Sequence, residues 1–79
     1  MNDGEFYRIS TVTGRSYDVF KTIKILNLKQ ATLYMANNIY PVDIKISINN
    51  KTKEKCLVFY FDREESKEVY DKWCKYELN

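Results

Sequence analysis

Residues 55–61, Lys-Cys-Leu-Val-Phe-Tyr-Phe, form the most hydrophobic stretch of the chain. Their number and their aromatic and β-branched content are typical of a strand. Side chains alternate between the two sides of a strand, so this one has two apolar faces, one made by Cys56, Val58 and Tyr60 and the other by Leu57, Phe59 and Phe61. Each of these faces must be shielded from water by other residues. We expect the second face to pack in the interior of the protein.

The strand predicted before it has the clearest alternation in the sequence. Apolar Val42, Ile44, Ile46 and Ile48 alternate with polar Asp43, Lys45 and Ser47, which is typical of a strand with one buried and one solvated face. Residues 49–53, Asn-Asn-Lys-Thr-Lys, form a polar turn. We therefore expect residues 42–48 and 55–61 to form an antiparallel hairpin with a basic tip.

Asn27 and Gln30 have the spacing of a capping box, in which each side chain satisfies a free amide of the first helical turn. A helix is predicted to follow, and Asn37-Asn38 to end it, because Asn tolerates the left-handed conformation of a helix terminus. Its apolar stripe consists of Leu28, Ala31, Met35 and Ile39. Leu33 lies off this stripe and either packs under a neighbouring element or faces a partner.

Asp62 and Glu65 form a second capping box, before a helix predicted from about Arg63 to about Tyr76. Its outer face has two pairs of opposite charge at i,i+4 spacing, Glu68 with Lys72 and Asp71 with Lys75. Its inner face is predicted to consist of Val69, Tyr70, Trp73 and Cys74. Trp73 is the expected anchor of this helix on the sheet.

The N-terminal segment has strand composition in Glu5–Val12 and again in Tyr17–Ile23, and Thr13-Gly14 between them can turn the chain. A hairpin is one reading of residues 1–19, and a loose arm is the other. With the hairpin, the sequence predicts a single α+β domain over residues 1–79, of order ββαββα, with both helices on one face of a small antiparallel sheet. The other face of strand 55–61 must then be covered by the N-terminal segment or by a second molecule.

The composition gives little support for a catalytic, metal-binding or nucleic-acid-binding function. The formal charge of the 79 residues is +2, too small by itself to indicate a nucleic-acid partner. Cys56 and Cys74 lack the spacing of a metal or redox site, and the chain has no His. We expect two buried thiols in a reducing compartment, no metal and no cofactor. No apolar run approaches the length of a membrane span, and the acidic start is unlike a signal peptide, so a cytoplasmic location is expected.

From about Phe20 onward, several core and capping positions form a pattern: Phe20-Lys21-Thr22, Leu28, Ala31, Met35, Ile39, the segment 57–62, Glu64-Glu65 and Trp73. In these positions the chain resembles a family of short uncharacterised proteins from phages and low-GC Gram-positive bacteria. Asn38 stands where that family has Gly. The resemblance implies no catalytic residues. It implies the setting of phage or prophage accessory genes, whose small products commonly act by binding a host protein. Our hypothesis for this chain is that it inhibits or redirects such a host protein, for example a CRISPR or other defence nuclease.

The residues themselves argue against an enzyme. A nucleophilic Cys would need a base, and the carboxylates of the last helix are expected on its solvated face. The main alternative is a nucleic-acid-binding module, because an aromatic strand can stack bases and Lys51, Lys53 and Lys55 could contact phosphates. The small residues that let bases approach such a strand are absent, so core packing is the favoured interpretation of the aromatic residues.

We therefore predict a non-enzymatic protein-binding module with a host protein as partner. A homodimer that pairs through the sheet surface is a third hypothesis. The residues that we expect to be exposed and to contact the partner are Tyr7, Leu33, Tyr34, Tyr40, Lys51, Lys53 and Lys55.

Overall fold

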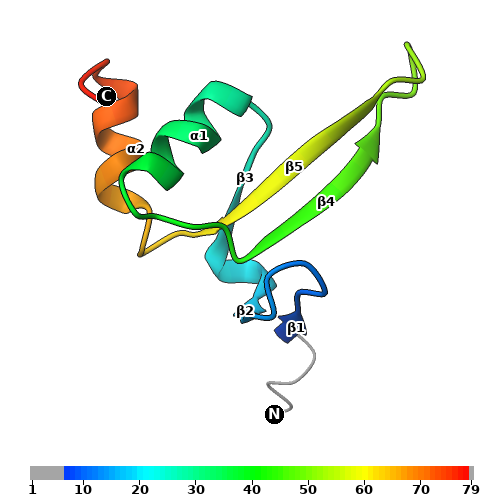
Figure 1. Cartoon of the computed structure of the whole chain (residues 1–79), viewed down its shortest axis with the longest axis horizontal. Coiled ribbons are helices and arrows are strands. Elements are labelled where there is room, and N and C mark those ends of the chain that lie inside the picture. Colours follow the sequence, from blue (N-terminus) through cyan, green and yellow to red (C-terminus); the bar gives the residue numbers. More distant parts are fainter. Residues whose placement is uncertain (1–6, 79) are drawn as a thin grey trace.

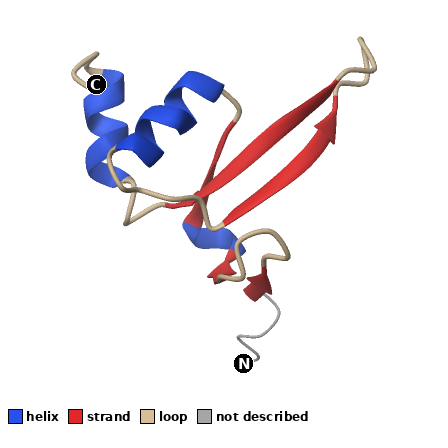
Figure 2. Cartoon of the chain, in the orientation of Figure 1, coloured by secondary structure: helices blue, strands red, loops and turns tan. Residues whose placement is uncertain are grey.

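The computed structural model describes residues 7–78, and this part of the chain contains five short antiparallel strands and two α-helices (Figure 1). The elements are β1 (Tyr7–Ile9), β2 (Ser16–Asp18), the short 3-10 helix η2 (Val19–Lys21), β3 (Thr22–Ile25), α1 (Leu28–Ala36), β4 (Asp43–Ile48), β5 (Lys55–Asp62) and α2 (Lys67–Cys74). The predicted α+β class is confirmed. The strands form two sheets, β1-β2 and β3-β5-β4, where one sheet was expected (Figure 2).

The hydrophobic strand is the centre of the larger sheet. β5 pairs antiparallel with β3 on one side and with β4 on the other. The predicted hairpin of residues 42–48 and 55–61 is therefore confirmed, with Ile44 opposite Phe59 and Ile46 opposite Leu57. Since cross-strand partners share a face, these four side chains lie on the same side of the sheet.

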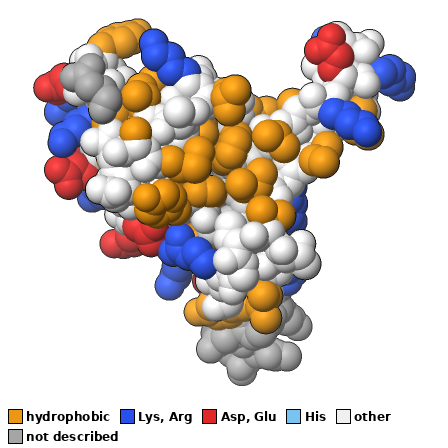
Figure 3. Space-filling model, in the orientation of Figure 1, with side chains coloured by type: hydrophobic (Ala, Val, Ile, Leu, Met, Phe, Trp, Pro, Cys, Tyr) orange, Lys and Arg blue, Asp and Glu red, His pale blue; other side chains and the backbone are white. Residues whose placement is uncertain are grey.

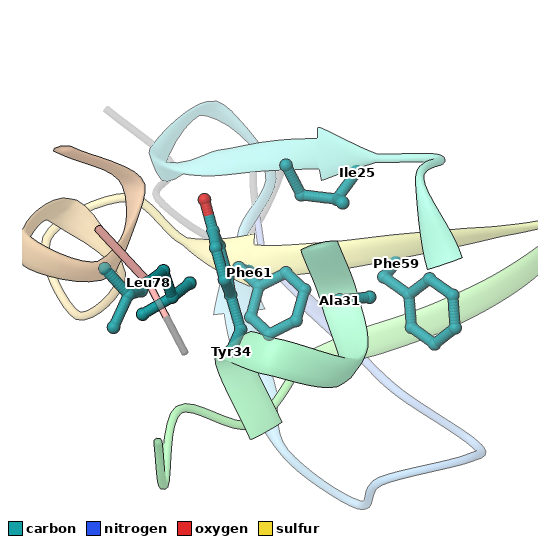
Figure 4. Packing of buried hydrophobic residues seen from close by; sticks show 7 residues of the cluster. Ile25, Ala31, Tyr34, Phe59, Phe61 and Leu78 are labelled. Carbon is teal, nitrogen blue, oxygen red and sulfur yellow. The ribbon is translucent and has the colours of Figure 1, made fainter. Parts of the chain in front are cut away.

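The two helices cover this same side. Phe59 and Phe61 of β5 and Ile25 of β3 join the buried cluster with residues of α1 and α2, so both helices lie on one face, as the sequence predicts. In the close view the ring of Tyr34 meets that of Phe61 edge-on, with 5.0 Å between the ring centroids (Figure 4). Such a pair contributes about 0.5–1.5 kcal/mol beyond the apolar area that it buries.

The caps of α1 are close to those predicted. The Asn27 side chain accepts a hydrogen bond from the backbone N–H of Gln30 at 3.1 Å. The reciprocal bond of a capping box, from the Asn27 N–H to the Gln30 side-chain oxygen, is not made. The Gln30 side chain lies beside Tyr34, and its Nε2–H donates to the Tyr34 hydroxyl at 2.9 Å. At the other end Asn38 adopts φ = 68°, the left-handed conformation expected of it.

α2 is shorter than predicted. The Asp62 carboxylate accepts from the backbone N–H groups of Glu64 and Glu65, but these bonds stabilise a turn, and the helix begins only at Lys67. Trp73 packs against the core as expected, whereas Tyr70 and Cys74 are exposed and the prediction that they face inward is wrong. Leu78, beyond the helix, folds back into the core cluster.

The N-terminal hairpin exists, but its second strand is broken. β1 pairs with β2, and Gly14 in the connection has φ = 76°, a conformation that glycine adopts without strain. Residues 17–23, predicted as one strand, divide between β2 and β3, because the Asp18 side chain caps η2 by accepting from the Phe20 N–H. Residues 5 and 6 of the predicted first strand lie outside the described part of the chain.

Candidate functional site

The β4–β5 hairpin projects well beyond the two helices (Figure 1). On its helix-facing side three apolar residues are uncovered: Ile46 is 68% exposed, Ile48 56% and Leu57 46%. We call these three residues the arm surface. The prediction that Leu57 packs in the interior is wrong, and so is the prediction that Ile46 and Ile48 lie on a buried face. Phe59 and Phe61, which share their face, are buried as expected.

The arm is uncovered because the helices are too short for the sheet. The nine residues of α1 span about 14 Å at 1.5 Å per residue, whereas the eight residues of β5 span about 27 Å at 3.4 Å per residue. Helical cover therefore ends near Phe59. The space-filling view shows hydrophobic side chains continuing from the helical body onto the arm (Figure 3).

Lysine residues surround the tip of the arm. Lys51, Lys53 and Lys55 are exposed there, and Glu54 leaves the tip with a net charge of 3 − 1 = +2. The Asn49 side chain holds the turn by accepting from the backbone N–H groups of Lys51 and Thr52. None of the three lysines belongs to an ion pair among residues 7–78, so the arm combines an apolar face with a solvated basic end.

A buried polar cluster fixes the base of the arm. The Asp43 carboxylate, at the start of β4, accepts hydrogen bonds from the Ser10 hydroxyl at 2.7 Å, the Tyr17 hydroxyl at 2.5 Å and the Ile44 N–H at 2.9 Å. Burial acts to raise the pKa of Asp43, but these three bonds and the charge of Lys45 outweigh it and lower that pKa. Burial and the bond to Asp43 raise the pKa of Tyr17 to about 12. The N-terminal hairpin is thus joined to the sheet through an ionised carboxylate.

The cluster also identifies the cover of the other sheet face. Asp43 and Tyr60 are cross-strand partners on the face turned away from the helices, and the N-terminal hairpin contacts that face through Ser10 and Tyr17. Val58, on the same face, is buried. Of the two covers considered for this face, the N-terminal segment is the one found, and of the β5 residues on this face only Cys56, near the tip, is exposed.

Tyr60 is the one aromatic residue of β5 on this second face. The ammonium groups of Lys24 and Lys45 lie over its ring, at 5.9 and 5.5 Å from the centroid. The rings of Phe59 and Phe61 are buried beneath the helices and cannot stack on bases. An aromatic platform for nucleic acid is thus reduced to Tyr60, whose ring is already contacted by two cations.

The predicted partner-contact residues do not form one surface. Tyr7 on β1 and Tyr40 before β4 are exposed, and the lysines lie at the tip, at the other end of the molecule from β1 (Figure 1). Leu33 is half-buried against the core. Tyr34 is fully buried, so the expectation that it is exposed is wrong. Its position three residues after Ala31, and so next to Ala31 on the helix surface, could have indicated this.

Both thiols are also placed differently from expectation. Cys56 and Cys74 are exposed and free, so the prediction of buried thiols is wrong. Within residues 7–78 no three acidic or Cys side chains gather where they could hold a metal ion, and no helix has the length and hydrophobicity to cross a membrane.

The chain was compared with protein-family models, with curated proteins and with solved structures, and none of them matches it. The family resemblance drawn from the sequence therefore stays a prediction. The arm surface, its basic tip and the cluster at its base are the candidate site on which a functional proposal must depend.

Proposed function

We propose that the protein is a non-enzymatic protein-binding module that docks through the arm surface. One observation supports this above all: Ile46, Ile48 and Leu57 continue the core face of the sheet into solvent and are about half to two-thirds exposed. Contiguous exposed apolar residues on a small domain commonly mark an interaction site. Hydrogen bonds to Asp43 also hold the base of the arm, so the entropy cost of ordering the arm when a partner binds is small.

The charge of the tip suggests the chemistry of the partner. A cationic tip next to an apolar strip is complementary to a protein surface with an apolar groove bordered by Asp or Glu. The proposed setting is the one that the family resemblance implies, a phage accessory protein that binds and inhibits or redirects a host protein such as a defence nuclease.

The test compares arm variants with a matched control. Ile46→Glu and Leu57→Glu place a charge on the arm surface, and Val12→Glu places the same charge on another exposed apolar residue, in the turn of the N-terminal hairpin. All three sites are exposed, so each substitution should change stability by about 0.5 kcal/mol or less, which thermal unfolding checks. The proteins are immobilised and exposed to lysate of a low-GC Gram-positive bacterium, and captured proteins are identified by mass spectrometry.

We expect wild type and Val12→Glu to retain the same identified protein and the two arm variants to lose at least about 90% of it, because a charge in an apolar contact costs more than about 1.4 kcal/mol. Retention of that protein by Leu57→Glu would contradict the proposal. Sedimentation tests the homodimer: if wild type self-associates and Ile46→Glu does not, a second copy is the occupant of the arm.

Nucleic-acid binding is the second candidate function, and the observation that favours it is the Tyr60 ring with its two neighbouring lysines. Lys24 and Lys45 lie around an aromatic ring on one sheet face, and such rings can stack on single-stranded bases. Mobility shifts with single- and double-stranded probes at two salt concentrations test it. Binding that falls steeply with salt and is lost in Tyr60→Ala would favour this function over protein binding.

A further inference from the structure

A groove lies between β3 and α2, along the sheet edge opposite to the arm strand β4. Its volume is about 390 Å³. Ile23 and Ile25 of β3 and Tyr70 of α2 give it apolar walls, and the buried Ser66 lies at the start of α2. Tyr70 is exposed although the sequence predicts it to face inward, because it faces this groove.

The β3 side of the groove is an open strand edge. The Arg63 N–H donates to the Lys21 carbonyl at 2.8 Å, so Lys21 and Arg63 form a hydrogen-bonded pair next to the β3–β5 ladder. This pair shows which residues of β3 bond to β5. In an antiparallel ladder bonded and non-bonded residues alternate, so Ile23 and Ile25 bond to β5. The N–H and C=O groups of Thr22 and Lys24 then point away from the sheet. Among the described residues β3 has no strand on this side.

The charge of the groove has one sign. Lys24, Arg63 and Lys67 line it, and none of the residues that line it is acidic. The ion pairs formed within residues 7–78 are Arg15–Glu65 and Glu68–Lys72, so these three cations are not neutralised by a described carboxylate. A ligand that fits must offer carboxylates together with apolar side chains.

We propose that this groove binds an extended acidic peptide, which adds as a strand to the open edge of β3. Backbone bonds to Thr22 and Lys24 would hold the peptide, as in other strand additions at a sheet edge. Alternate peptide side chains would point to opposite sides, apolar ones toward Ile23, Ile25 and Tyr70, and acidic ones toward Lys24. This inference goes beyond the proposed function and is independent of it, because no residue of the arm surface lines the groove.

The probe is a fluorescein-labelled ten-residue peptide of alternating Val and Glu, and a peptide of alternating Val and Lys is its control. Lys24→Glu reverses the charge toward which the acidic side chains of the peptide would point, at an exposed position of β3. Lys29→Glu makes the same change of net charge on α1, outside the groove. Leu57→Glu tests independence from the arm.

By fluorescence anisotropy we expect the acidic peptide to bind and the basic one not to bind. Lys24→Glu should weaken binding about tenfold, whereas Lys29→Glu and Leu57→Glu should change it less than about twofold. Equal losses in Lys24→Glu and Lys29→Glu, or no binding of the acidic peptide at millimolar concentration, would overturn the proposal. So would equal binding of the two peptides.

The backbone part of the proposal has its own readout. In amide NMR spectra of the wild-type protein, the peptide should shift the Thr22 and Lys24 signals and slow their hydrogen exchange. Two further peptides carry N-methyl groups, one on every odd-numbered amide and the other on every even-numbered amide. One of them should lose binding and the other should retain it, because the amides of an added strand point alternately toward β3 and away from it. Binding that both methylated peptides retain would exclude strand addition.

Discussion

The hydroxyl of Tyr17 offers the sharpest test of how the arm is held. Tyr17→Phe removes one of the three donors to the buried Asp43 carboxylate and leaves the ring in place. A hydrogen bond to a charged group contributes about 1.5–3 kcal/mol, so we expect the free energy of unfolding to fall by about 2 kcal/mol. For a domain of this size the total is about 4–12 kcal/mol. The melting temperature should fall by about 8–16 °C.

The assay is equilibrium unfolding in urea at pH 7, with a double-mutant cycle and an exposed control. Tyr7→Phe removes an exposed hydroxyl from the same hairpin and should change stability by less than about 0.5 kcal/mol. Asp43→Asn replaces the charged acceptor by a neutral one. In that background the loss caused by Tyr17→Phe should shrink by about 1 kcal/mol or more, because the charge on the acceptor is gone.

Two results would refute this reasoning. One is a loss of unfolding free energy in Tyr17→Phe that is no larger than the loss in Tyr7→Phe. This would mean that the bond to Asp43 does not stabilise the folded protein. The other is an equal loss in the wild-type and Asp43→Asn backgrounds, which would mean that the hydroxyl acts without the carboxylate. Either result would remove the cluster as the anchor of the arm.

Two further predictions concern pH and packing. The pKa of Tyr17 rises from 10.0 to about 12 on folding, so its contribution is fully present below pH 10 and should be lost between pH 10 and 12. Urea unfolding in that range should show wild type losing about 2 kcal/mol more than Tyr17→Phe, and parallel curves would contradict this. Phe61→Ala should cost about 3–5 kcal/mol, and Leu57→Ala, although on the same face, less than about 1 kcal/mol. Similar losses in thermal unfolding would mean that Leu57 packs in solution.

Most of the fold could be predicted because its signals are local. The alternation in β4, the apolar β5, the Asn27 cap and the left-handed Asn38 each depend on residues close in sequence. The break between β2 and β3 also has a local cause, the Asp18 cap, but the pattern of residues 17–23 alone did not distinguish a cap from a strand residue.

The candidate site could not be predicted because it depends on lengths and on distant contacts. Alternation assigns Leu57 and Ile46 to the core face but does not say how far helical cover extends along that face. That extent follows from where α1 ends and how far β5 runs. The Asp43 cluster joins residues 26 and 33 positions apart, and no short-range pattern indicates such a contact.

The position of the arm at the edge of the sheet raises the question of whether it binds a different protein or pairs with further copies of this chain. β4 is an edge strand with one apolar face, which by itself favours pairing with other chains. Lys45 on that strand and the lysines of the tip oppose pairing of two identical edges, because like charges would meet. The Asp43 cluster also fixes the base of the hairpin. A fixed apolar strip next to a cationic tip therefore favours the proposed protein partner, whose surface would supply the carboxylates, over a second copy, and sedimentation of wild type and Ile46→Glu distinguishes the two cases.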